Sequence, residues 1–362
     1  MNPRLNPTVS VVKISDTVLE FFKTNTRQQV RIKVEDDTIL GIACSLDGAR
    51  SIEQICEESG VSAESLNRLL GFMREKGILD NTLPHSDFAG YERFRRVVHF
   101  LSEYSRSHEH LVDMWESIRG STTLVIGMGA VGTWVACNLA QSGAGSVILM
   151  DEDTVEASNI HRQFGFRAAD VGRLKVDVVA ERLLEYNPGM KVVRVPEAMG
   201  EGSLSRFDGV DLSLIVNCAD SPNVDTTSLW VGEYAMGRGI PHIVGGGYNL
   251  HLSLVGQTVL PGRSACVKCF QKSLEEQNTV DPAKVKKLAV KNRKVGSFGP
   301  MCSLIASMVG MEAVKILSAG IEPANTNRRG EFDIFTMGVS YKSFDRRSDC
   351  EWCGTDGKYF PM

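Results

Sequence analysis

The chain has 362 residues, enough for two or three domains with buried cores. Hydrophobic residues make up 43% of it and charged residues 23%, a globular composition that excludes a largely disordered chain. The 40 basic and 44 acidic residues give a formal charge of −4, which argues against a general binder of nucleic acid or of an anionic membrane. Nine cysteines are too few for a disulfide scaffold, and their odd number indicates a reducing compartment.

No segment predicts export or membrane insertion. The first ten residues contain Pro3 and Pro7 and no continuous apolar run, so they do not have the pattern of a signal peptide. The longest uncharged run, residues 295–311, is interrupted by glycine, serine and proline and falls short of the roughly 20 residues that span a bilayer. We therefore expect a cytoplasmic protein.

The first eighty residues predict a small domain of winged-helix-like type. Short β-rich runs at residues 30–34 and 39–42 precede two helical patterns. Ser51 and Gln54 form a capping box that begins the first helix, and the second helix runs over residues 62–77. A linker and a helical arm are expected next, over residues 81–120.

The remainder of the chain, residues 121–362, predicts an α/β domain with a doubly wound sheet. A strand at residues 122–126, a helix and a second strand at 146–150 make a βαβ unit. The other predicted elements of this domain are glycine-rich strands at 243–259, a charged loop at 275–294 and an apolar helix at 301–317.

A glycine-rich turn joins the first strand of this unit to its helix. Gly127, Gly129 and Gly132 have the G-x-G-x-x-G spacing that permits a tight turn and lets the amides of a helix N-terminus approach a phosphate. Asp151 ends the next strand 19 residues after Gly132, where a carboxylate can accept hydrogen bonds from ribose hydroxyls. The pattern predicts a nucleotide site, with NAD and ATP both open.

The residues that follow Asp151 distinguish these two nucleotides. They match the order D-x-D-x-V-x-x-S-N-x-x-R-Q, followed by a lysine after a glycine, and resemble the ATP-binding signature of the ubiquitin-activating-enzyme-like family. That family includes the bacterial molybdopterin and thiamine sulfur-carrier adenylyltransferases. A redox domain has no need of this cluster. The resemblance implies that ATP is bound by the three glycines and by Asp151, Asp153, Asn159, Arg162, Gln163 and Lys175.

The resemblance also assigns roles within this set. Asp151 would hold the ribose, Asn159 and Arg162 the β- and γ-phosphates, Gln163 the neighbouring backbone, and Lys175 the α-phosphate. Fixed cations agree with adenylation chemistry, because negative charge develops on the α-phosphorus and on the departing pyrophosphate. The alternative is that Arg162 and Lys175 are solvated surface charges, which would leave their joint spacing unexplained.

Two further residues complete the implied active site. Asp220 follows the apolar strand 212–216 in a C-x-D context, where the family's aspartate holds Mg²⁺; by itself it could instead cap the next helix. Arg96 lies in a segment that resembles the family's R-Y-x-R-Q sequence, whose arginine reaches the γ-phosphate of the partner subunit, and the family therefore implies a homodimer. Phe94 and Val97 depart from that pattern. The implied catalytic residues are Arg96, Arg162, Lys175 and Asp220.

The cysteines include two C-x-x-C pairs, Cys266–Cys269 and Cys350–Cys353, about 80 residues apart. Two such pairs are the pattern of a closed tetrahedral zinc site, which would clamp the end of the chain onto the core; the alternative is redox-active dithiols. Relatives that transfer an acyl group to sulfur carry a cysteine before the long C-terminal helix, whereas no cysteine lies between Cys269 and Cys302. Cys302 falls within the apolar helix, so we expect acyl-adenylate chemistry without an enzyme thioester.

The N-terminal domain does not predict DNA binding, because residues 1–80 hold 10 basic and 12 acidic side chains. Residues 46–52 and 73–79 instead resemble the PqqD-type domain that recognises precursor peptides. That resemblance implies β-augmentation, in which a leader peptide adds a strand to the sheet edge and a groove against the helix gives specificity. A dimerisation or lid module is the alternative.

A leader-binding domain joined to an adenylating domain resembles the enzymes of the microcin C7 and pantocin types, which mature ribosomally made peptides. The resemblance implies leader-guided, ATP-dependent adenylation of a carboxyl group on a precursor peptide, with Mg²⁺ and structural Zn²⁺ as cofactors. We favour activation of glutamate side chains and cyclisation over transfer of AMP to the C-terminus of the peptide. Activation of a ubiquitin-like sulfur carrier and a non-catalytic docking scaffold stay open.

Overall fold

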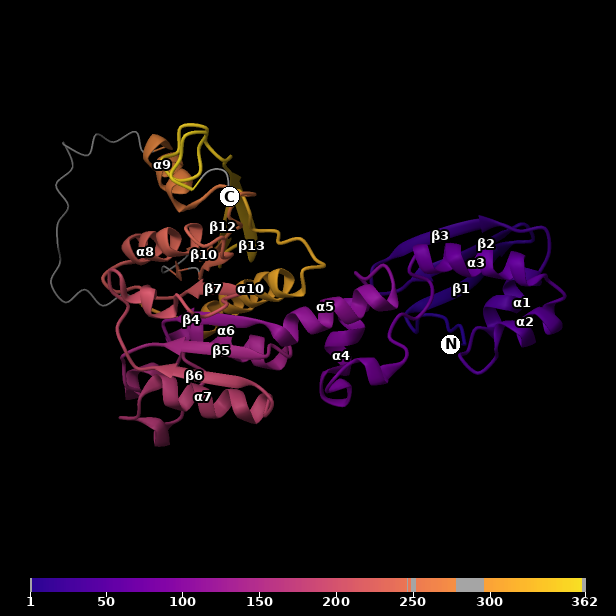
Figure 1. Cartoon of the computed structure of the whole chain (residues 1–362), viewed down its shortest axis with the longest axis horizontal. Coiled ribbons are helices and arrows are strands. Elements are labelled where there is room, and N and C mark those ends of the chain that lie inside the picture. Colours follow the sequence, from indigo (N-terminus) through magenta and orange to yellow (C-terminus); the bar gives the residue numbers. More distant parts are fainter. Residues whose placement is uncertain (1, 246, 249–251, 278–295, 360–362) are drawn as a thin grey trace. The chain divides into compact units, whose positions relative to one another are not determined.

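A computed structural model describes residues 2–245, 247–248, 252–277 and 296–359 (Figure 1). The chain divides into two compact units, Met1–Glu116 (unit 1) and Ser117–Met362 (unit 2). The boundary falls within a helix, so the segment expected as a linker and helical arm contributes most of its residues to unit 1. The predicted charged loop lies almost wholly outside the described residues.

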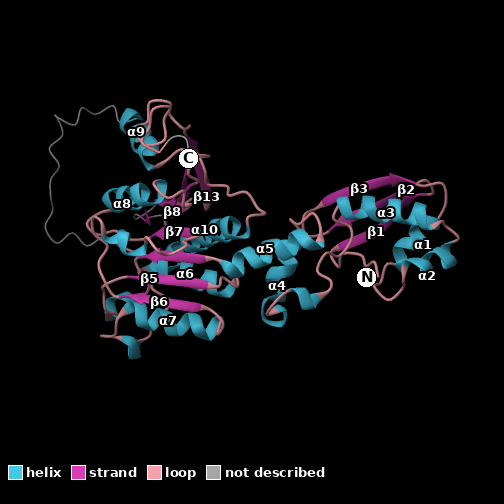
Figure 2. Ribbon diagram, in the orientation of Figure 1, coloured by secondary structure: helices cyan, strands magenta, loops and turns pink. Residues whose placement is uncertain are grey.

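Unit 1 is a three-stranded antiparallel sheet with helices around it (Figure 2). Leu19 and Phe21 of the central strand are buried against Ile55 and the other helical residues of one core. The capping box of Ser51 and Gln54 is confirmed. The elements of unit 1 are β1 (Val9–Ser15), β2 (Val18–Lys23), β3 (Gln28–Lys33), α1 (Thr38–Ser45), α2 (Ile52–Ser59), α3 (Ala63–Glu75), η1 (His85–Asp87), α4 (Tyr91–Ser102) and α5 (His108–Gly120).

Two elements of unit 1 depart from the sequence prediction. Residues 39–42, predicted as a β-rich run, lie in α1, because Ile39 and Ile42 are three residues apart and share a helical face that packs on the core. Strands β1 and β2 have no counterpart in the prediction. In β2, adjacent Phe21 and Phe22 interrupt the apolar–polar alternation by which a half-buried strand is recognised.

Unit 2 is built on a mixed six-stranded sheet of order β11-β8-β7-β4-β5-β6, in which only β11 is antiparallel. Figure 1 shows β6, β5, β4 and β7 side by side. Leu124 and Ile126 of β4 pack with Val231 and Ala235 of α8, whereas α6 packs against α10. The α/β fold is thus confirmed, and both strands of the predicted βαβ unit have the predicted bounds.

A second, four-stranded antiparallel sheet of order β13-β12-β10-β9 completes unit 2. The elements of unit 2 after α5 are β4 (Thr122–Ile126), α6 (Ala130–Gln141), β5 (Ser146–Met150), η2 (Ala157–Asn159), η3 (Ala168–Asp170), α7 (Lys175–Tyr186), β6 (Lys191–Val195), η4 (Ser203–Phe207), β7 (Leu214–Asn217), α8 (Val224–Met236), β8 (His242–Val244), β9 (Gly247–Tyr248), β10 (Leu252–Val255), β11 (Gln257–Val259), α9 (Val267–Gln277), α10 (Gly299–Ser318), β12 (Arg328–Asp333) and β13 (Gly338–Ser343).

Helix α10 is longer than the uncharged run in the sequence. Its 20 residues, which include an 18-residue stretch with a mean hydropathy of 1.5, are enough to cross a membrane by length and composition alone. Its most apolar stretch is 56% buried inside the protein, as in the core helix of a soluble protein. Glu312 lies within this helix, and its buried carboxylate accepts hydrogen bonds from Lys315 Nζ at 2.7 Å and from the amides of Ala324 at 3.0 Å and Asn325 at 2.8 Å.

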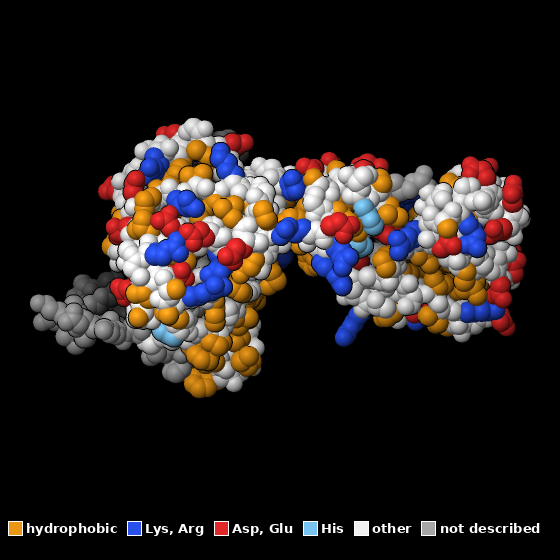
Figure 3. Space-filling view, turned by 90° about the horizontal axis from the view of Figure 1, so that it is seen from below, with side chains coloured by type: hydrophobic (Ala, Val, Ile, Leu, Met, Phe, Trp, Pro, Cys, Tyr) orange, Lys and Arg blue, Asp and Glu red, His pale blue; other side chains and the backbone are white. Residues whose placement is uncertain are grey.

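Acidic and basic side chains are interspersed over the face of the protein that Figure 3 shows. Many charged side chains of the protein form exposed pairs, as Lys358 does with Glu233 at 2.9 Å and Arg263 with Glu322 at 2.9 Å. Exposed pairs of this kind contribute little to the free energy of unfolding, because water already solvates both charges well.

A buried ion pair joins the first strands of unit 1 to the segment after α4. Lys23 Nζ lies 3.4 Å from Glu103 Oε2, and the two side chains are only 5% and 7% exposed. Glu103 Oε1 accepts hydrogen bonds from Thr8 Oγ1 at 3.2 Å and from Asn6 Nδ2 at 3.4 Å. Residues beyond position 80 therefore belong to the same compact unit as the predicted N-terminal domain.

We expect Lys23→Met to lower the free energy of unfolding of unit 1 by about 3–5 kcal/mol, because it leaves the Glu103 carboxylate buried without its cation. The double variant Lys23→Met/Glu103→Leu should recover most of that loss. Urea unfolding followed by circular dichroism measures both, and Lys13→Met, which removes an exposed ion pair, is the matched control. A double variant as unstable as the single one would contradict the charge-burial explanation.

Candidate active site

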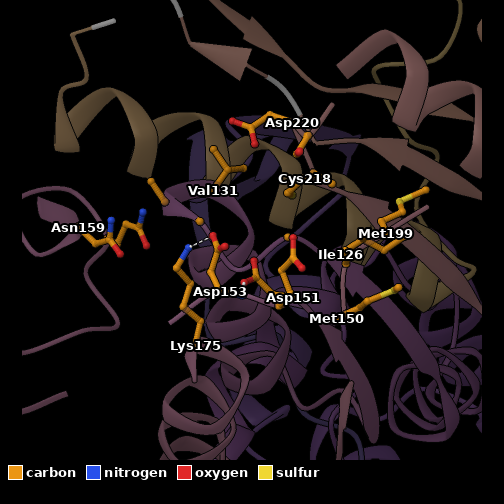
Figure 4. A pocket seen from close by; sticks show the side chains of 18 of the residues that line it. Ile126, Val131, Met150, Asp151, Asp153, Asn159, Lys175, Met199, Cys218 and Asp220 are labelled. Carbon is orange, nitrogen blue, oxygen red and sulfur yellow. Dashed lines mark hydrogen bonds and ion pairs between the residues drawn. The ribbon is translucent and has the colours of Figure 1, made fainter. Parts of the chain in front are cut away.

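A cavity of about 480 Å³ opens at the carboxyl ends of the parallel strands of unit 2 (Figure 4). Its floor includes Ile126 of β4, Met150 of β5 and Asn217 of β7. Strand β4 lies between β5 and β7, so the chain leaves it in one direction along the sheet and later returns on its other side. Ligands of open α/β sheets bind at such switch points, because the loops diverge there.

Each of the three positions in the predicted turn favours glycine for a different structural reason. Gly127 has a φ of 88°, and a Cβ there would lie 2.7 Å from Cys218 O. At Gly132 a Cβ would lie 1.8 Å from Gly127 O, so helix α6 can approach the turn only without a side chain. At Gly129, which precedes α6, a Cβ would meet nothing within 4 Å and would face the cavity that this residue lines. The turn therefore leaves open space where a phosphate would approach the helix N-terminus.

Asp151 stands at the end of β5 beside this turn. Its Oδ2 accepts a hydrogen bond from Met128 N at 2.5 Å, and its Oδ1 accepts one from Asp153 N at 2.8 Å. Burial raises the pKa of Asp151, and the positive charge of Lys175 opposes that rise. The carboxylate is thus oriented by the backbone at the mouth of the cavity, where each oxygen keeps a further lone pair for a hydroxyl group.

Lys175 and Asp153 form an ion pair on the cavity wall, drawn as a dashed line in Figure 4. Lys175 Nζ lies 2.6 Å from Asp153 Oδ2, and the lysine side chain is 8% exposed against 61% for the aspartate. Lys175 N also donates to Asp153 O at 2.9 Å. The ammonium group at the start of α7 is therefore a fixed cation rather than the solvated surface charge of the alternative interpretation.

The segment around η2 supplies two side chains with unsatisfied polar atoms. Arg162 Nε and Gln163 Oε1 are buried and have no hydrogen-bond partner among the described residues. Asn159, which is also buried, uses its Oδ1 to accept a hydrogen bond from Glu156 N at 3.0 Å. All three side chains line the cavity, and buried polar atoms without partners fit a site that a polar ligand fills.

Asp220 is exposed at the cavity mouth, three residues beyond the end of β7. It does not cap the next helix, because Asn223 is the N-cap of α8 and its side chain accepts a hydrogen bond from Thr226 N at 2.9 Å. The alternative interpretation of Asp220 as a helix cap is therefore wrong. An exposed carboxylate beside a phosphate site is the kind of ligand that Mg²⁺ takes in addition to phosphate oxygens.

Arg96 is not among the residues that line this cavity. It lies on the exposed side of α4, in unit 1, whereas every other predicted nucleotide-binding residue lies in unit 2. The γ-phosphate contact that the family resemblance implies for Arg96 would be made to the partner subunit, so it does not involve the cavity of the same chain.

Residues that the sequence analysis missed also line the cavity. Glu197 and Met199 follow β6, whose carboxyl end lies at the same edge of the sheet. Recognising residues 191–195 as a strand would have indicated them. Glu152 and Glu156 line the cavity as well. Its charged lining residues are the acids Asp151, Glu152, Asp153, Glu156, Glu197 and Asp220 and the bases Arg162 and Lys175.

The four predicted cysteine ligands, Cys266, Cys269, Cys350 and Cys353, meet in one buried cluster. Their sulfur atoms all lie within 4.8 Å of one another. The separations are 3.5 Å for Cys266–Cys350, 3.4 Å for Cys269–Cys353 and 3.9 Å for Cys266–Cys269. Four sulfurs at about 2.3 Å from a zinc ion would be about 3.8 Å apart, so this cluster fits a tetrahedral metal site better than two separate dithiols.

The other cysteines near the site are not placed for catalysis. Burial raises the pKa of Cys218, which lines the cavity, to about 12. Cys302 is fully buried in α10. A thiol must ionise to act as a nucleophile, and burial without a neighbouring cation disfavours that ionisation.

Comparison with known proteins places the chain among adenylating enzymes. Residues 105–353 match the ThiF family. The chain is 26% identical over 242 residues to the molybdopterin-synthase adenylyltransferase of Escherichia coli K12, a match covering 67% of this chain and 90% of that protein. It is 27% identical over 318 residues to the adenylyltransferase and sulfurtransferase UBA4 of Vanderwaltozyma polyspora, covering 82% and 66%. It spans about half the length of other fungal proteins of that name.

Among solved structures, MccB of E. coli with ATP has a TM-score of 0.73 and 20% sequence identity, covering 98% of this chain and all of MccB. MccB, named there as a microcin C7 biosynthetic enzyme, in complex with N-formylated MccA has a TM-score of 0.74 and 21% identity. At these identities the similarity concerns the fold.

The glycine turn offers a matched pair of variants. We expect Gly132→Ala to lower the free energy of unfolding by roughly 3 kcal/mol, because its Cβ would meet the backbone of Gly127. Gly129→Ala should keep wild-type stability and weaken ATP binding roughly tenfold or more, because its methyl group would enter the open space of the turn. Thermal unfolding and ATP titration measure the two effects. Unchanged ATP affinity of Gly129→Ala would exclude a phosphate above this turn.

Proposed function

The chain belongs to the ThiF family of ATP-dependent adenylating enzymes, and on that premise we propose that it adenylates a carboxyl group of a ribosomally made precursor peptide, guided by a leader peptide bound to unit 1. The observation that carries the proposal is the cavity itself, in which an open glycine turn, a ribose-side carboxylate and two fixed cations meet at one edge of the sheet. A nicotinamide site would have no use for the buried Lys175 and the half-buried Arg162 beside the phosphate turn.

In the proposed complex, ATP lies across the carboxyl ends of β4 and β5. Asp151 accepts hydrogen bonds from the ribose hydroxyls, and the amides around Gly129 face the phosphates. Arg162 donates to the β- and γ-phosphates together with the Asn159 side chain, and Lys175 reaches the α-phosphate. Gln163 holds the backbone of the neighbouring segment. Asp153 keeps Lys175 at the cavity wall through the ion pair that the structure contains.

The chemical step is an in-line displacement. An oxygen of the peptide carboxylate attacks the α-phosphorus, the bond from that phosphorus to the bridging oxygen of the β-phosphate breaks, and its electron pair leaves with pyrophosphate. The product is an acyl adenylate. Lys175 and Arg162 stabilise the negative charge that grows on the α-phosphoryl group and on the leaving pyrophosphate.

The charge of the cavity requires an additional cation. Six acidic and two basic side chains line it, a formal balance of −4, and ATP adds further negative charge. Bound Mg²⁺ would supply positive charge at the phosphates, and Asp220 is the exposed carboxylate placed to hold it. We therefore expect ATP binding to depend strongly on the divalent cation.

The state of the thiols near the cavity supports transfer without an enzyme thioester. Cys302 is buried, burial raises the pKa of Cys218 to about 12, and the sequence has no cysteine between Cys269 and Cys302. A nucleophile of the same peptide would then attack the activated carbonyl carbon, lose its proton and displace AMP. We favour this cyclisation, with glutamate side chains as the activated groups; transfer of AMP to the C-terminus of the peptide is the second outcome.

The leader peptide would add to the β3 edge of unit 1. Both edges of the sheet are free within the described part of the chain, but β1 carries an irregular register between Lys13 and Ser15 that interrupts its ladder. Strand β3 keeps a regular register, and its half-buried Val30 and Ile32 alternate with exposed residues. Backbone hydrogen bonds would supply affinity, and apolar leader side chains would pack beside these two residues.

A second candidate function is the activation of a ubiquitin-like sulfur carrier. The identity of 26% to the E. coli molybdopterin-synthase adenylyltransferase favours it. Unit 1 favours the peptide substrate, because the match to that relative covers only 67% of this chain. In either case we propose a homodimer in which Arg96 contacts the γ-phosphate bound by the partner subunit.

We expect Asp220→Asn to reduce peptide-dependent pyrophosphate release by roughly 10²–10³-fold, because it removes the carboxylate that would hold the metal at the phosphates. Asp225→Asn, which removes an exposed carboxylate of α8 outside the cavity, is the matched control and should stay near wild type. The measurement combines pyrophosphate release with mass spectrometry of the precursor peptide.

The mass of the peptide distinguishes the candidates. Loss of one water with free AMP supports cyclisation, and a peptide carrying AMP supports C-terminal AMP transfer. Turnover only with a carrier protein would favour the second candidate function, and no ATP turnover with any leader-bearing peptide or carrier would contradict the adenylation proposal.

The cysteine cluster would hold a structural zinc ion, which joins the segment around Cys350 to α9. We expect about one zinc per chain in the purified protein. Cys350→Ser should lose it and unfold at a temperature lower by about 10 °C, because metal binding contributes to folding. Elemental analysis and thermal unfolding measure this, with Cys44→Ser, an exposed cysteine, as control. A zinc-free protein with two disulfides would instead support redox dithiols.

A further inference from the structure

The guanidinium of Arg162 is held on one side only. Its Nη1 donates to the backbone oxygen of Ser158 at 2.8 Å and lies 2.9 Å from His161 Nε2. Its Nε is buried without a partner in the described part of the chain, and the residue lines the cavity. Two contacts at one nitrogen thus fix the group while its other N–H groups remain for a ligand.

The contact with His161 has a defined chemistry. Arginine has five N–H donors and no acceptor, so the imidazole must present the lone pair of Nε2 to the guanidinium. In this arrangement the imidazole carries its proton on Nδ1. A side chain without an acceptor at this position would leave Nη1 with the Ser158 oxygen alone.

The backbone around His161 is fixed by the start of α10. A Cβ at Gly299 would lie 3.1 Å from His161 O, 3.2 Å from the ring of Phe164 and 3.4 Å from Arg162 Cα. Phe164 also lies against Trp134 of α6, with ring centroids 6.0 Å apart. The imidazole is exposed, but the segment that carries it is closely packed on two helices.

We propose that His161 is a positioning residue, which orients the Arg162 guanidinium toward the phosphates of ATP. The inference rests on the proposed function, because it takes Arg162 as a phosphate ligand. His161 itself touches no ATP atom in this assignment. It lowers the freedom of the long arginine side chain before ATP binds, so that less conformational entropy is lost on binding.

The test measures the ATP dissociation constant of the full chain by calorimetry with Mg²⁺. His161→Leu should weaken binding about tenfold, the effect of losing one hydrogen bond to a charged group. His161→Gln should stay within about twofold of wild type, because its amide oxygen can accept the same hydrogen bond. In an Arg162→Ala background, His161→Leu should cause no further loss.

Three results would overturn the inference: His161→Gln as weak as His161→Leu, equal losses with and without Arg162, or wild-type affinity of His161→Leu. Thermal unfolding serves as the folding control, and the exposed His161 should leave it unchanged. Wild-type ATP affinity of Arg162→Ala would overturn both this inference and the role of Arg162 in the proposed function. If the ATP dissociation constants change as expected but no peptide is adenylated, only the proposed peptide substrate is contradicted.

Discussion

The cavity depends on a row of backbone hydrogen bonds that carries the parallel sheet one residue past its strands. In each bond, the amide of the residue that follows one strand donates to the carbonyl of the last residue of the neighbouring strand in the sheet. The first residues of the turns after four strands are therefore hydrogen-bonded in line with the sheet. The bonds are Gly245 N to Asn217 O at 2.6 Å, Cys218 N to Ile126 O at 2.7 Å, Gly127 N to Met150 O at 2.8 Å and Asp151 N to Val195 O at 3.1 Å. Asp151, which belongs to this row, and Asp220, two residues after Cys218, are thereby brought to one edge of the sheet.

Charged side chains are distributed unevenly around the cavity. Acidic side chains outnumber basic ones at the cavity, and both of its cations are held by contacts within the protein. Lys175 is nearly buried and paired with Asp153, and Arg162 is held by Ser158 and His161. Fixed cations and exposed carboxylates suit a ligand that arrives with its own divalent ion, because a buried ammonium costs no reorganisation when phosphate binds.

The glycine turn could be predicted from the sequence because its geometry is local. Gly127, Gly129 and Gly132 lie within six residues of one another, and their spacing follows from one turn between a strand and a helix. The sequence left two roles open for Asp220, since a carboxylate after a strand can also cap a helix. The structure excludes the capping role, because Asn223 is the N-cap of α8. Glu197 was missed, because its place in the cavity depends on β6 pairing beside β5.

The elements of the βαβ unit, the glycine turn, the capping box of α2 and the C-x-x-C spacing of the cysteines could be predicted from the sequence, because each of them depends on the spacing of neighbouring residues. Packing of whole elements set the contacts between residues that lie far apart in the chain. It brought Cys266 and Cys350 to 3.5 Å, joined Lys23 to Glu103, and turned the 39–42 run into a helix. Contacts of this kind are set by packing of whole elements, which local spacing does not encode.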